Sequence, residues 1–355
     1  MIRPLENTAF SFLNAYQWLC KSRKSHPPGS DIWSFKREWT HKANRIIKMF
    51  AAGSYKFDVQ KKMTLSCGET IAMWSSKDSL IIKVLTGILQ NRLDPWLSES
   101  CYHLKGHGGL KGAVRDVMDH LPDYKFFCKT DVKSYYDSID HTTLMMKLYE
   151  YIDDRIIMGY VWQFLNRCVE WGGLYQDVSI GIARGSSLSP LLGAFYLMDL
   201  DNRMEALDVK YFRYMDDILI LAPTRWKLKK AIRVMNRTFN ELRLEQHPDK
   251  TVIGRIERGF DFLGYHFNPG RLSVAGKTVE RLMEHIARLY EQGADYRRIG
   301  LYVKKWLQWV HAGTAKFQPI DYQDRFSGFC PDFSGGSKQN LCGSFFPPAQ
   351  AYQTY

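Results

Sequence analysis

Two adjacent carboxylates, Asp216 and Asp217, stand between segments that have the composition of buried strands. Residues 209–214 and 218–221 are rich in β-branched, aromatic and aliphatic side chains, so we expect a hairpin with Met215, Asp216 and Asp217 in its tight turn. Two like charges on one turn repel each other. A divalent cation such as Mg²⁺ relieves the repulsion, because it binds carboxylate and phosphate oxygens together. The simpler interpretation is that the two acids only supply turn chemistry.

A third acid, Asp131, comes at the end of another segment that resembles a buried strand, residues 125–132. The residues that follow, 133–141, predict a turn that opens into a helix. An acid at the junction of a strand and a turn is well placed to meet the hairpin that carries Asp216 and Asp217. A cluster of three acids needs a cation more than a pair does.

Residues 181–190 form a candidate phosphate-binding loop, which enters a helix predicted at residues 191–204. Within it, Gly185 lets the backbone approach a ligand, and Arg184 offers five donors to a phosphate. A plain helix entry with serine capping explains the same residues.

A glycine-rich basic run, residues 103–112, matches neither a P-loop nor a dinucleotide fingerprint, and we favour a solvated loop. Cys101, His103 and His107 raise the question of zinc, but no second pair of ligands stands at a recognisable spacing.

Composition narrows the class of protein. The 355 residues include 49 Lys and Arg against 37 Asp and Glu, a formal net charge of +12, which favours a polyanionic partner such as nucleic acid. No apolar run of transmembrane length and no signal-peptide pattern is present, so we expect a cytoplasmic protein. The seven cysteines are scattered and odd in number, as in free thiols of a reducing compartment.

The remaining pattern predicts mostly helices with a few strands. Between residues 1 and 50 we expect two helices, the second capped by Asp31. Other expected helices and strands are a hairpin at 55–72 that turns at Cys67-Gly68, a helix from Lys77 to Asp94, a helix at 152–171 ended by Gly172-Gly173, a basic amphipathic helix at 225–244, a strand or hairpin at 260–267, and two helices between 279 and 310.

The order and spacing of these features resemble the successive palm motifs of reverse transcriptases. The motifs are Asp131 with Tyr136, Gly181-x-x-x-Gly185-x-x-x-Ser189-Pro190, Tyr214-Met215-Asp216-Asp217, Lys250-Thr251, and Phe262-Leu263-Gly264-Tyr265. The nearest likeness is to compact bacterial enzymes of the group II intron, retron and defence-associated types. It is clear over about residues 50–270 and looser to about residue 313.

The resemblance implies an α+β fold, that of a right-hand polymerase, in which an antiparallel palm sheet carries the acids. The implied regions are an N-terminal helical extension (1–50), fingers (51–124, with part of 142–180 returning to the fingers and palm), a palm (125–270), a helical thumb (271–315) and a loosely ordered tail (316–355).

The resemblance also implies roles for individual residues. Catalysis is expected from Asp131, Asp216, Asp217 and Lys250, with Asp131, Val132, Asp216 and Asp217 as contacts of two Mg²⁺ ions, for which Mn²⁺ can substitute. Such a metal pair clamps the attacking and departing oxygens of an in-line displacement. Tyr136 matches the residue whose ring excludes a 2′-hydroxyl. The expected nucleotide contacts are Ser134, Tyr135, Tyr136, Arg184, Gly185, Lys61, Lys62 and Lys77, and the expected primer grip is Phe262, Leu263, Gly264 and Tyr265.

Some family features are missing. Ala183-Arg184 stands where family members carry Pro-Gln, and the glycine-rich run replaces a Gly-Phe-Arg sequence. Near residues 71–76 no arginine matches the one that clamps the triphosphate, and no maturase, zinc-binding or endonuclease extension is evident after the thumb. These departures put the handling of template and nucleotide in question.

The implied function is RNA-directed DNA polymerase activity, in a bacterial defence or retron-type system with a noncoding RNA. The implied partners are an RNA template, a DNA product and dNTPs, with a second reverse transcriptase, an effector protein or another copy of the chain as further candidates and no membrane. Two alternatives stay open. One is a template-independent or protein-primed DNA nucleotidyltransferase, and the other is an inactive RNA-binding scaffold.

Overall fold

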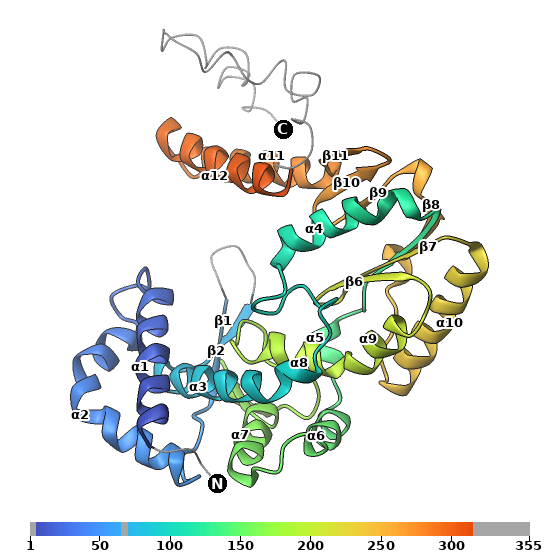
Figure 1. Ribbon diagram of the computed structural model, residues 1–355. Coiled ribbons are helices and arrows are strands. Elements are labelled where there is room, and N and C mark those ends of the chain that lie inside the picture. Colours follow the sequence, from blue (N-terminus) through green and yellow to red (C-terminus); the bar gives the residue numbers. More distant parts are fainter. Residues whose placement is uncertain (1–4, 65–69, 315–355) are drawn as a thin grey trace. The chain divides into compact units, whose positions relative to one another are not determined.

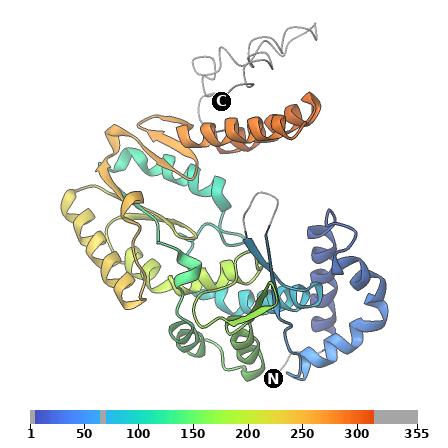
Figure 2. The ribbon, with the colours of Figure 1, turned by 180° about the vertical axis from the view of Figure 1, so that it is seen from behind.

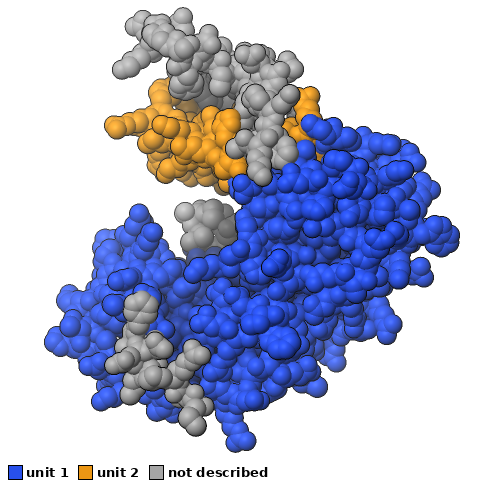
Figure 3. Space-filling model, viewed as in Figure 1, with its two compact units in different colours: residues 1–263, 268–270 blue, residues 264–267, 271–355 orange. Residues whose placement is uncertain are grey.

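The computed structural model describes residues 5–64 and 70–314, which fall into two compact units. The first unit contains the chain up to Leu263 together with Asn268–Gly270, and the second contains Gly264–Phe267 and the residues from Arg271 onward (Figure 3). Across the described ranges, no helix combines the length and the apolar character that crossing a membrane requires.

Three long helices open the first unit: α1 (Leu5–Ser22), α2 (Asp31–Ala51) and α3 (Ser76–Leu93) (Figure 1). α1 contacts both of the others, and the rings of Phe12 in α1 and Phe50 in α2 pack edge to face with 5.5 Å between their centroids. The predicted pair of N-terminal helices and the helix at 77–94 are therefore confirmed. The predicted role of Asp31 was wrong, because its carboxylate makes no cap bond to α2 and accepts instead from the backbone N–H of Ser76 at 2.5 Å.

A four-stranded sheet follows in the order β2-β1-β4-β5. Its strands are β1 (Gln60–Thr64), β2 (Thr70–Met73), β4 (Cys168–Trp171) and β5 (Leu174–Asp177). The antiparallel β1–β2 pair confirms the hairpin predicted at 55–72, whereas its expected turn at Cys67-Gly68 lies outside the described residues.

The helix predicted over residues 152–171 was wrong in its second half. α7 (Arg155–Leu165) ends before β4 begins, and β4 turns directly into β5 through Gly172 and Gly173. Both glycines have positive φ, +60° and +84°, as both central residues of a type I′ hairpin turn require. The glycine pair is therefore a hairpin turn and does not end the helix.

The second sheet of this unit carries the candidate acids. It has the order β6-β7-β3-β8, and its strands are β3 (Phe126–Thr130), β6 (Lys210–Tyr214), β7 (Asp217–Ala222) and β8 (Val252–Arg255). All of its pairs are antiparallel. α10 (Arg225–Glu241) packs on β7 and β3, and α9 (Met198–Glu205) packs on β6 (Figures 1 and 2). The basic amphipathic helix predicted at 225–244 is confirmed by α10.

Short helices connect these layers, and one of them corrects a prediction. They are α4 (Gly109–His120), α5 (Tyr135–Ser138), α6 (His141–Tyr149) and α8 (Ser189–Tyr196), with 3₁₀ turns at Asp94–Trp96, Leu121–Asp123, Pro248–Lys250 and Ile256–Arg258. The run 103–112 is not a solvated loop, because its second half begins α4 and Leu104 is 7% exposed.

The second unit contains β11 (Arg271–Val274), most of β10 (Tyr265–Asn268), and two helices, α11 (Gly276–Glu291) and α12 (Tyr296–Thr314). The two helices predicted between residues 279 and 310 are confirmed. β9 (Phe260–Phe262) and β10 confirm the strands predicted at 260–267. The tail predicted after residue 315 lies outside the described residues.

Candidate active site

Strand register brings the three acids together. β3 and β7 are antiparallel with Thr130 opposite Ile218, so Asp131, which follows Thr130, and Asp217, which precedes Ile218, are neighbours. Tyr214 pairs with Asp217, which leaves Met215 and Asp216 as a two-residue turn. Asp217 is therefore the first residue of β7 and not part of the turn that the sequence predicted.

Burial and mutual repulsion perturb these acids. Asp131 is only 6% exposed, and its side chain shares a hydrogen bond with Asp216. Burial, followed by the charge of Asp131, raises the pKa of Asp216 to about 7. The same two causes raise the pKa of Asp217. Close carboxylates hold a proton near neutral pH because their ionised forms repel each other, and a bound cation would relieve that repulsion.

Lys250 supplies a positive charge to this cluster. It lies on the 3₁₀ turn Pro248–Lys250, and its ammonium group donates a hydrogen bond to Asp131. That bond is the main cause that raises the pKa of Lys250. The backbone N–H of His247 donates to the carbonyl of Asp131 at 2.9 Å, which fixes the start of the turn beside the acid.

The carboxylate oxygens of the three acids are of the kind that binds a divalent cation, although the side chains are not arranged as a complete metal site. Among the described residues, no three His, Cys, Asp or Glu side chains are arranged to hold a metal ion. Asp131, Asp216 and Asp217 present only carboxylate oxygens, which hard cations prefer. Val132 is 1% exposed and can offer only its backbone carbonyl. His103 lies 3.4 Å from the sulfur of Cys101, but the two belong to no metal-binding group within the described ranges.

Met215 has a strained backbone conformation, which hydrogen bonds with two side chains hold in place. Its φ is +58°, in the left-handed region that a non-glycine residue rarely occupies. Its N–H donates to Nδ1 of His103 at 2.9 Å, and its carbonyl accepts from the guanidinium of Arg213 at 3.1 Å. Because Nδ1 accepts, Nε2 carries the imidazole proton and donates to the carbonyl of Pro190 at 3.1 Å. Burial, then the charge of Arg213, lowers the pKa of His103 to about 4.

Arg213 is itself held by a buried ion pair. Its Nε donates to Asp201 of α9 at 2.7 Å, and both side chains are fully buried. Tyr211 donates to the same carboxylate at 2.9 Å. Sequence reasoning considered His103 only as a zinc candidate and missed its contact with the turn, and it gave no role to Arg213. The available signal was an arginine inside an otherwise apolar strand segment, three residues before Asp216.

The short helix α5 positions two stacked tyrosines. Ser134, just before it, has a φ of +48°, and the rings of Tyr135 and Tyr136 stack at 5.6 Å. The side chain of Tyr135 is a core residue, since it is 3% exposed and its hydroxyl donates to the carbonyl of Gly193 at 2.5 Å. Only its backbone remains for the predicted nucleotide contact. Tyr136 reaches the turn that carries Asp216, where its hydroxyl lies 3.8 Å from the sulfur of Met215.

The other predicted nucleotide contacts do not all share one site. Lys62, Arg184 and Gly185 line one cavity of about 1170 Å³, whereas Lys77 lines a separate one of about 450 Å³. Lys77 pairs with Asp58 at 3.1 Å, and Lys61 is exposed on β1 and lines neither cavity. The structure therefore brings Lys62 to the loop of Arg184 but separates Lys77 from it. Arg184 forms an ion pair with Asp137, the residue after Tyr136.

The predicted primer grip spans the division between the units. Phe262 and Leu263 belong to the first unit, and Gly264 and Tyr265 belong to the second. Leu263 and Gly264 both have positive φ, +48° and +84°. Tyr265 is fully buried, and its hydroxyl lies 3.2 Å from the carbonyls of Trp309 and Val310 in α12. The role of these residues at a primer stays a prediction.

Comparison with known proteins agrees with this arrangement. Residues 72–267 match the family described as reverse transcriptase (RNA-dependent DNA polymerase). The chain is 23% identical over 210 residues to the group II intron-encoded protein LtrA of Lactococcus lactis, covering 58% of the chain and 35% of LtrA. It is 26% identical over 212 residues to protein YkfC of Escherichia coli, covering 47% of the chain and 56% of YkfC. It is 20% identical over 304 residues to the COX1/OXI3 intron 1 protein of Saccharomyces cerevisiae, covering 66% of the chain and 36% of that protein.

The chain thus spans between about a third and just over half of the length of these relatives. The family match includes both strands that carry the acids, and it covers more than half of the chain. The helices and the largely antiparallel sheets are those of the α+β right-hand polymerase fold that the sequence predicted. The chain belongs to the reverse transcriptase family.

Proposed function

We propose that the chain is an RNA-directed DNA polymerase that adds dNTPs to a primer. The observation that carries the proposal is the meeting of Asp131, Asp216 and Asp217 at one end of the second sheet, inside the region that matches the family. When bound, a pair of Mg²⁺ ions would stabilise the attacking and leaving oxygens of nucleotidyl transfer. The three carboxylates are the residues that would hold them.

The chain's own side chains supply the remaining functions. Tyr136, beside the turn, is proposed to close the space where a 2′-hydroxyl would lie and so to select deoxynucleotides. Lys250, already bonded to Asp131, is proposed to neutralise or protonate the departing pyrophosphate. Arg184 and Lys62, on the same cavity, are proposed to bind phosphate.

Primer extension tests the proposal directly. Purified protein is incubated with labelled dNTPs and an RNA template annealed to a DNA primer, in Mg²⁺ and separately in Mn²⁺. We expect template-dependent extension, which Asp216→Asn abolishes while RNA binding stays within about twofold, because only the carboxylate is removed. Full activity of Asp216→Asn would contradict the assigned role. No incorporation by the wild type on this template or on its co-purified RNA would refute the polymerase.

A second candidate is a template-independent or protein-primed DNA nucleotidyltransferase. It is favoured by Arg184, which stands where the family carries glutamine and is held by Asp137. Omitting the template separates the two functions, since untemplated addition would persist without RNA. An inactive RNA-binding scaffold is the weaker alternative, because it has no need for three clustered acids.

We further propose a cellular setting in which the chain works with a noncoding RNA, in a defence or retron-type system in the cytoplasm. The net charge of +12 supports an RNA partner, as do the names of two relatives, which are intron-encoded or intron proteins. A second reverse transcriptase, an effector protein or another copy of the chain remains a candidate partner. Sequencing of co-purified nucleic acid tests this setting, and random cellular RNA would contradict it.

A further inference from the structure

The outer face of α10 carries a row of positive charges that the proposed reaction does not use. Arg225, Lys229, Arg233 and Arg237 follow one another at intervals of four residues, so they form one ridge with about 6 Å of helix axis between neighbours. All four are exposed. The opposite face of the helix, with Leu228, Ala231, Met235 and Phe239, is buried.

The like charges of this ridge lower the stability of the helix. Like charges four residues apart in a helix are destabilising by a few tenths of a kcal/mol per pair, and the ridge contains three such pairs in succession. Among the described residues, Arg225, Lys229 and Arg233 have no acidic partner, and Arg237 alone pairs along the helix, with Glu241 at 3.0 Å. A solvated, self-compensating surface would alternate the signs of its charges.

An exposed tryptophan stands at the start of the ridge. Trp226 is 77% exposed, more than any other tryptophan of the described chain, and the ammonium of Lys229 lies 5.7 Å from its ring centre. An aromatic face beside unpaired cations is the combination that binds single-stranded nucleic acid, with the base stacked on the ring and the phosphates held by the cations. A second copy of the chain, with its own charge of +12, is a poor electrostatic match.

Topology places this cluster away from the acids. β7 runs from Asp217 beside the acids to Ala222, and α10 begins three residues later at Arg225. Six residues of strand span about 20 Å, so the Trp226 end of α10 lies at the opposite end of the sheet from the active site. An RNA segment bound there is therefore separate from the primer end at which nucleotides would be added.

We propose that the outer face of α10, formed by Arg225, Trp226, Lys229 and Arg233, is a second binding surface for single-stranded RNA, separate from the template and primer. The inference rests on the proposed function only in that the RNA of the polymerase is taken as the partner. The face holds a segment of RNA outside the cleft and so raises the affinity of the whole complex through a second attachment.

The test measures RNA binding with the active site already filled. The full chain is saturated with a short RNA template annealed to a chain-terminated DNA primer, and fluorescent oligouridine is then titrated by anisotropy over a range of KCl concentrations. For the triple variant R225Q/K229Q/R233Q we expect oligouridine affinity to fall at least about tenfold at low salt. The slope of log K against log salt should fall by about 2, because three phosphate contacts are lost.

Two further variants sharpen the result. Trp226→Ala should weaken oligouridine binding by about tenfold with an unchanged salt slope, since stacking involves no released counterion. The control R45Q/K56Q/R155Q removes the same charge from exposed residues elsewhere in the first unit that have no ion-pair partner in the described chain, and it should change affinity less than twofold. Equal losses in the two triple variants, or no loss in the first, would overturn the proposal.

Polymerase activity is measured in a separate primer-extension assay. Extension of the short template-primer should stay within about twofold in R225Q/K229Q/R233Q, because this part of α10 starts at the end of β7 opposite the acids. A wild type that does not polymerise but binds oligouridine through α10 would refute the proposed function and keep this surface. A chain that extends primers but binds oligouridine equally well after the substitutions in α10 would support the proposed function and refute this surface. Binding of the ridge to vesicles of anionic lipid, without binding to RNA, would also overturn it.

Discussion

His103 accepts a hydrogen bond from the backbone N–H of Met215, the left-handed residue directly before the candidate acid Asp216. Because the carbonyl of the same residue accepts from Arg213, both polar groups of Met215 are held by side chains. The direction of Asp216 therefore depends on an imidazole from the glycine-rich segment, more than a hundred residues away in the sequence.

The first prediction concerns this imidazole. His103→Ala leaves the partly buried N–H of Met215 without its acceptor, which costs at most about 1–3 kcal/mol, and it relaxes the strained turn. We expect kcat for primer extension to fall at least about tenfold with KM within twofold, because the reacting geometry changes more than substrate binding. His103→Asn, which keeps an acceptor near the Nδ1 position, should recover most of kcat. The control is His107→Ala, since His107 contacts Ser98 and not the turn. Equal loss in both alanine variants would contradict the prediction.

The second prediction concerns pH. Burial lowers the pKa of His103 from 6.5 to about 4, so between these values the unfolded chain binds a proton that the folded protein does not. The free energy of unfolding therefore falls as the pH drops through this window, by on the order of 1–3 kcal/mol from this group. Tm measured from pH 7 to pH 4 should drop less steeply for His103→Asn than for the wild type. Parallel curves would show that the imidazole titrates normally.

The third prediction separates stability from activity at the buried pair of Arg213 and Asp201. Asp201→Asn leaves a buried guanidinium without its counter-charge and should cost about 3–5 kcal/mol. The double variant Arg213→Met/Asp201→Leu removes both charges and should regain much of the lost Tm. It should still extend primers poorly, because Met215 has lost the donor to its carbonyl. Recovery of both Tm and activity would show that the pair is only structural.

The fourth prediction tests the proposed sugar selection. Tyr136→Ala should increase ribonucleotide incorporation by on the order of tenfold, because a steric block is removed. Gly193→Ala should also alter selectivity, since its new methyl group would lie 2.9 Å from the ring of Tyr136 and must displace it. Gly87→Ala, a helical glycine with no neighbour within 4 Å of the added carbon, is the matched control. Selectivity is measured as the ratio of kcat/KM for dNTP and NTP. Unchanged ratios in both tyrosine-site variants would remove Tyr136 from this role.

The fifth prediction concerns the ion pair of Arg184 and Asp137. If the guanidinium binds phosphate, Arg184→Ala should raise KM for dNTP several-fold. Asp137→Asn should leave KM unchanged or lower it, because the arginine no longer has a competing carboxylate. A structural pair would behave differently, with both variants raising KM and lowering Tm alike.

Local patterns in the sequence predicted most of the helices and strands. Alternating and apolar segments predicted both strands that flank the acids, and their order identified the family. The register that places Asp131 beside Asp217 joins residues far apart in the sequence, so no local pattern contains it. The contact of His103 with the turn was missed because glycine-rich composition favours a loop, whereas tertiary burial decided its role. β4 and β5 were missed because a Gly-Gly pair serves helix ends and hairpin turns alike.

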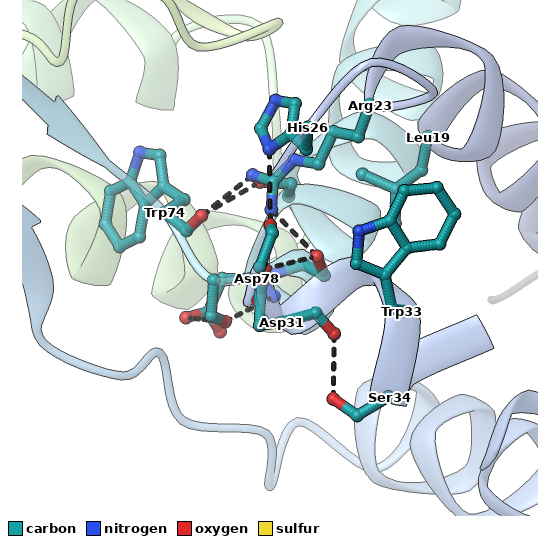
Figure 4. Close-up of polar contacts among 12 residues, drawn as sticks. Leu19, Arg23, His26, Asp31, Trp33, Ser34, Trp74 and Asp78 are labelled. Carbon is teal, nitrogen blue, oxygen red and sulfur yellow. Dashed lines mark hydrogen bonds and ion pairs between the residues drawn. The ribbon is translucent and has the colours of Figure 1, made fainter. Parts of the chain in front are cut away.

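Arg23 of the segment after α1 is 9% exposed and donates to the carbonyl of Trp74 at 2.8 Å and to the hydroxyls of Ser76 and Ser79 at 2.7 Å each (Figure 4). These groups lie at the end of β2 and the start of α3, so the two N-terminal helices are fastened to the part of the first unit that holds the first sheet. Shortened versions of this protein made for biochemistry should therefore retain residues 5–51. A cut at the apparent boundary near residue 50 would strip partners from the start of α3 and expose the apolar side of α3 to water.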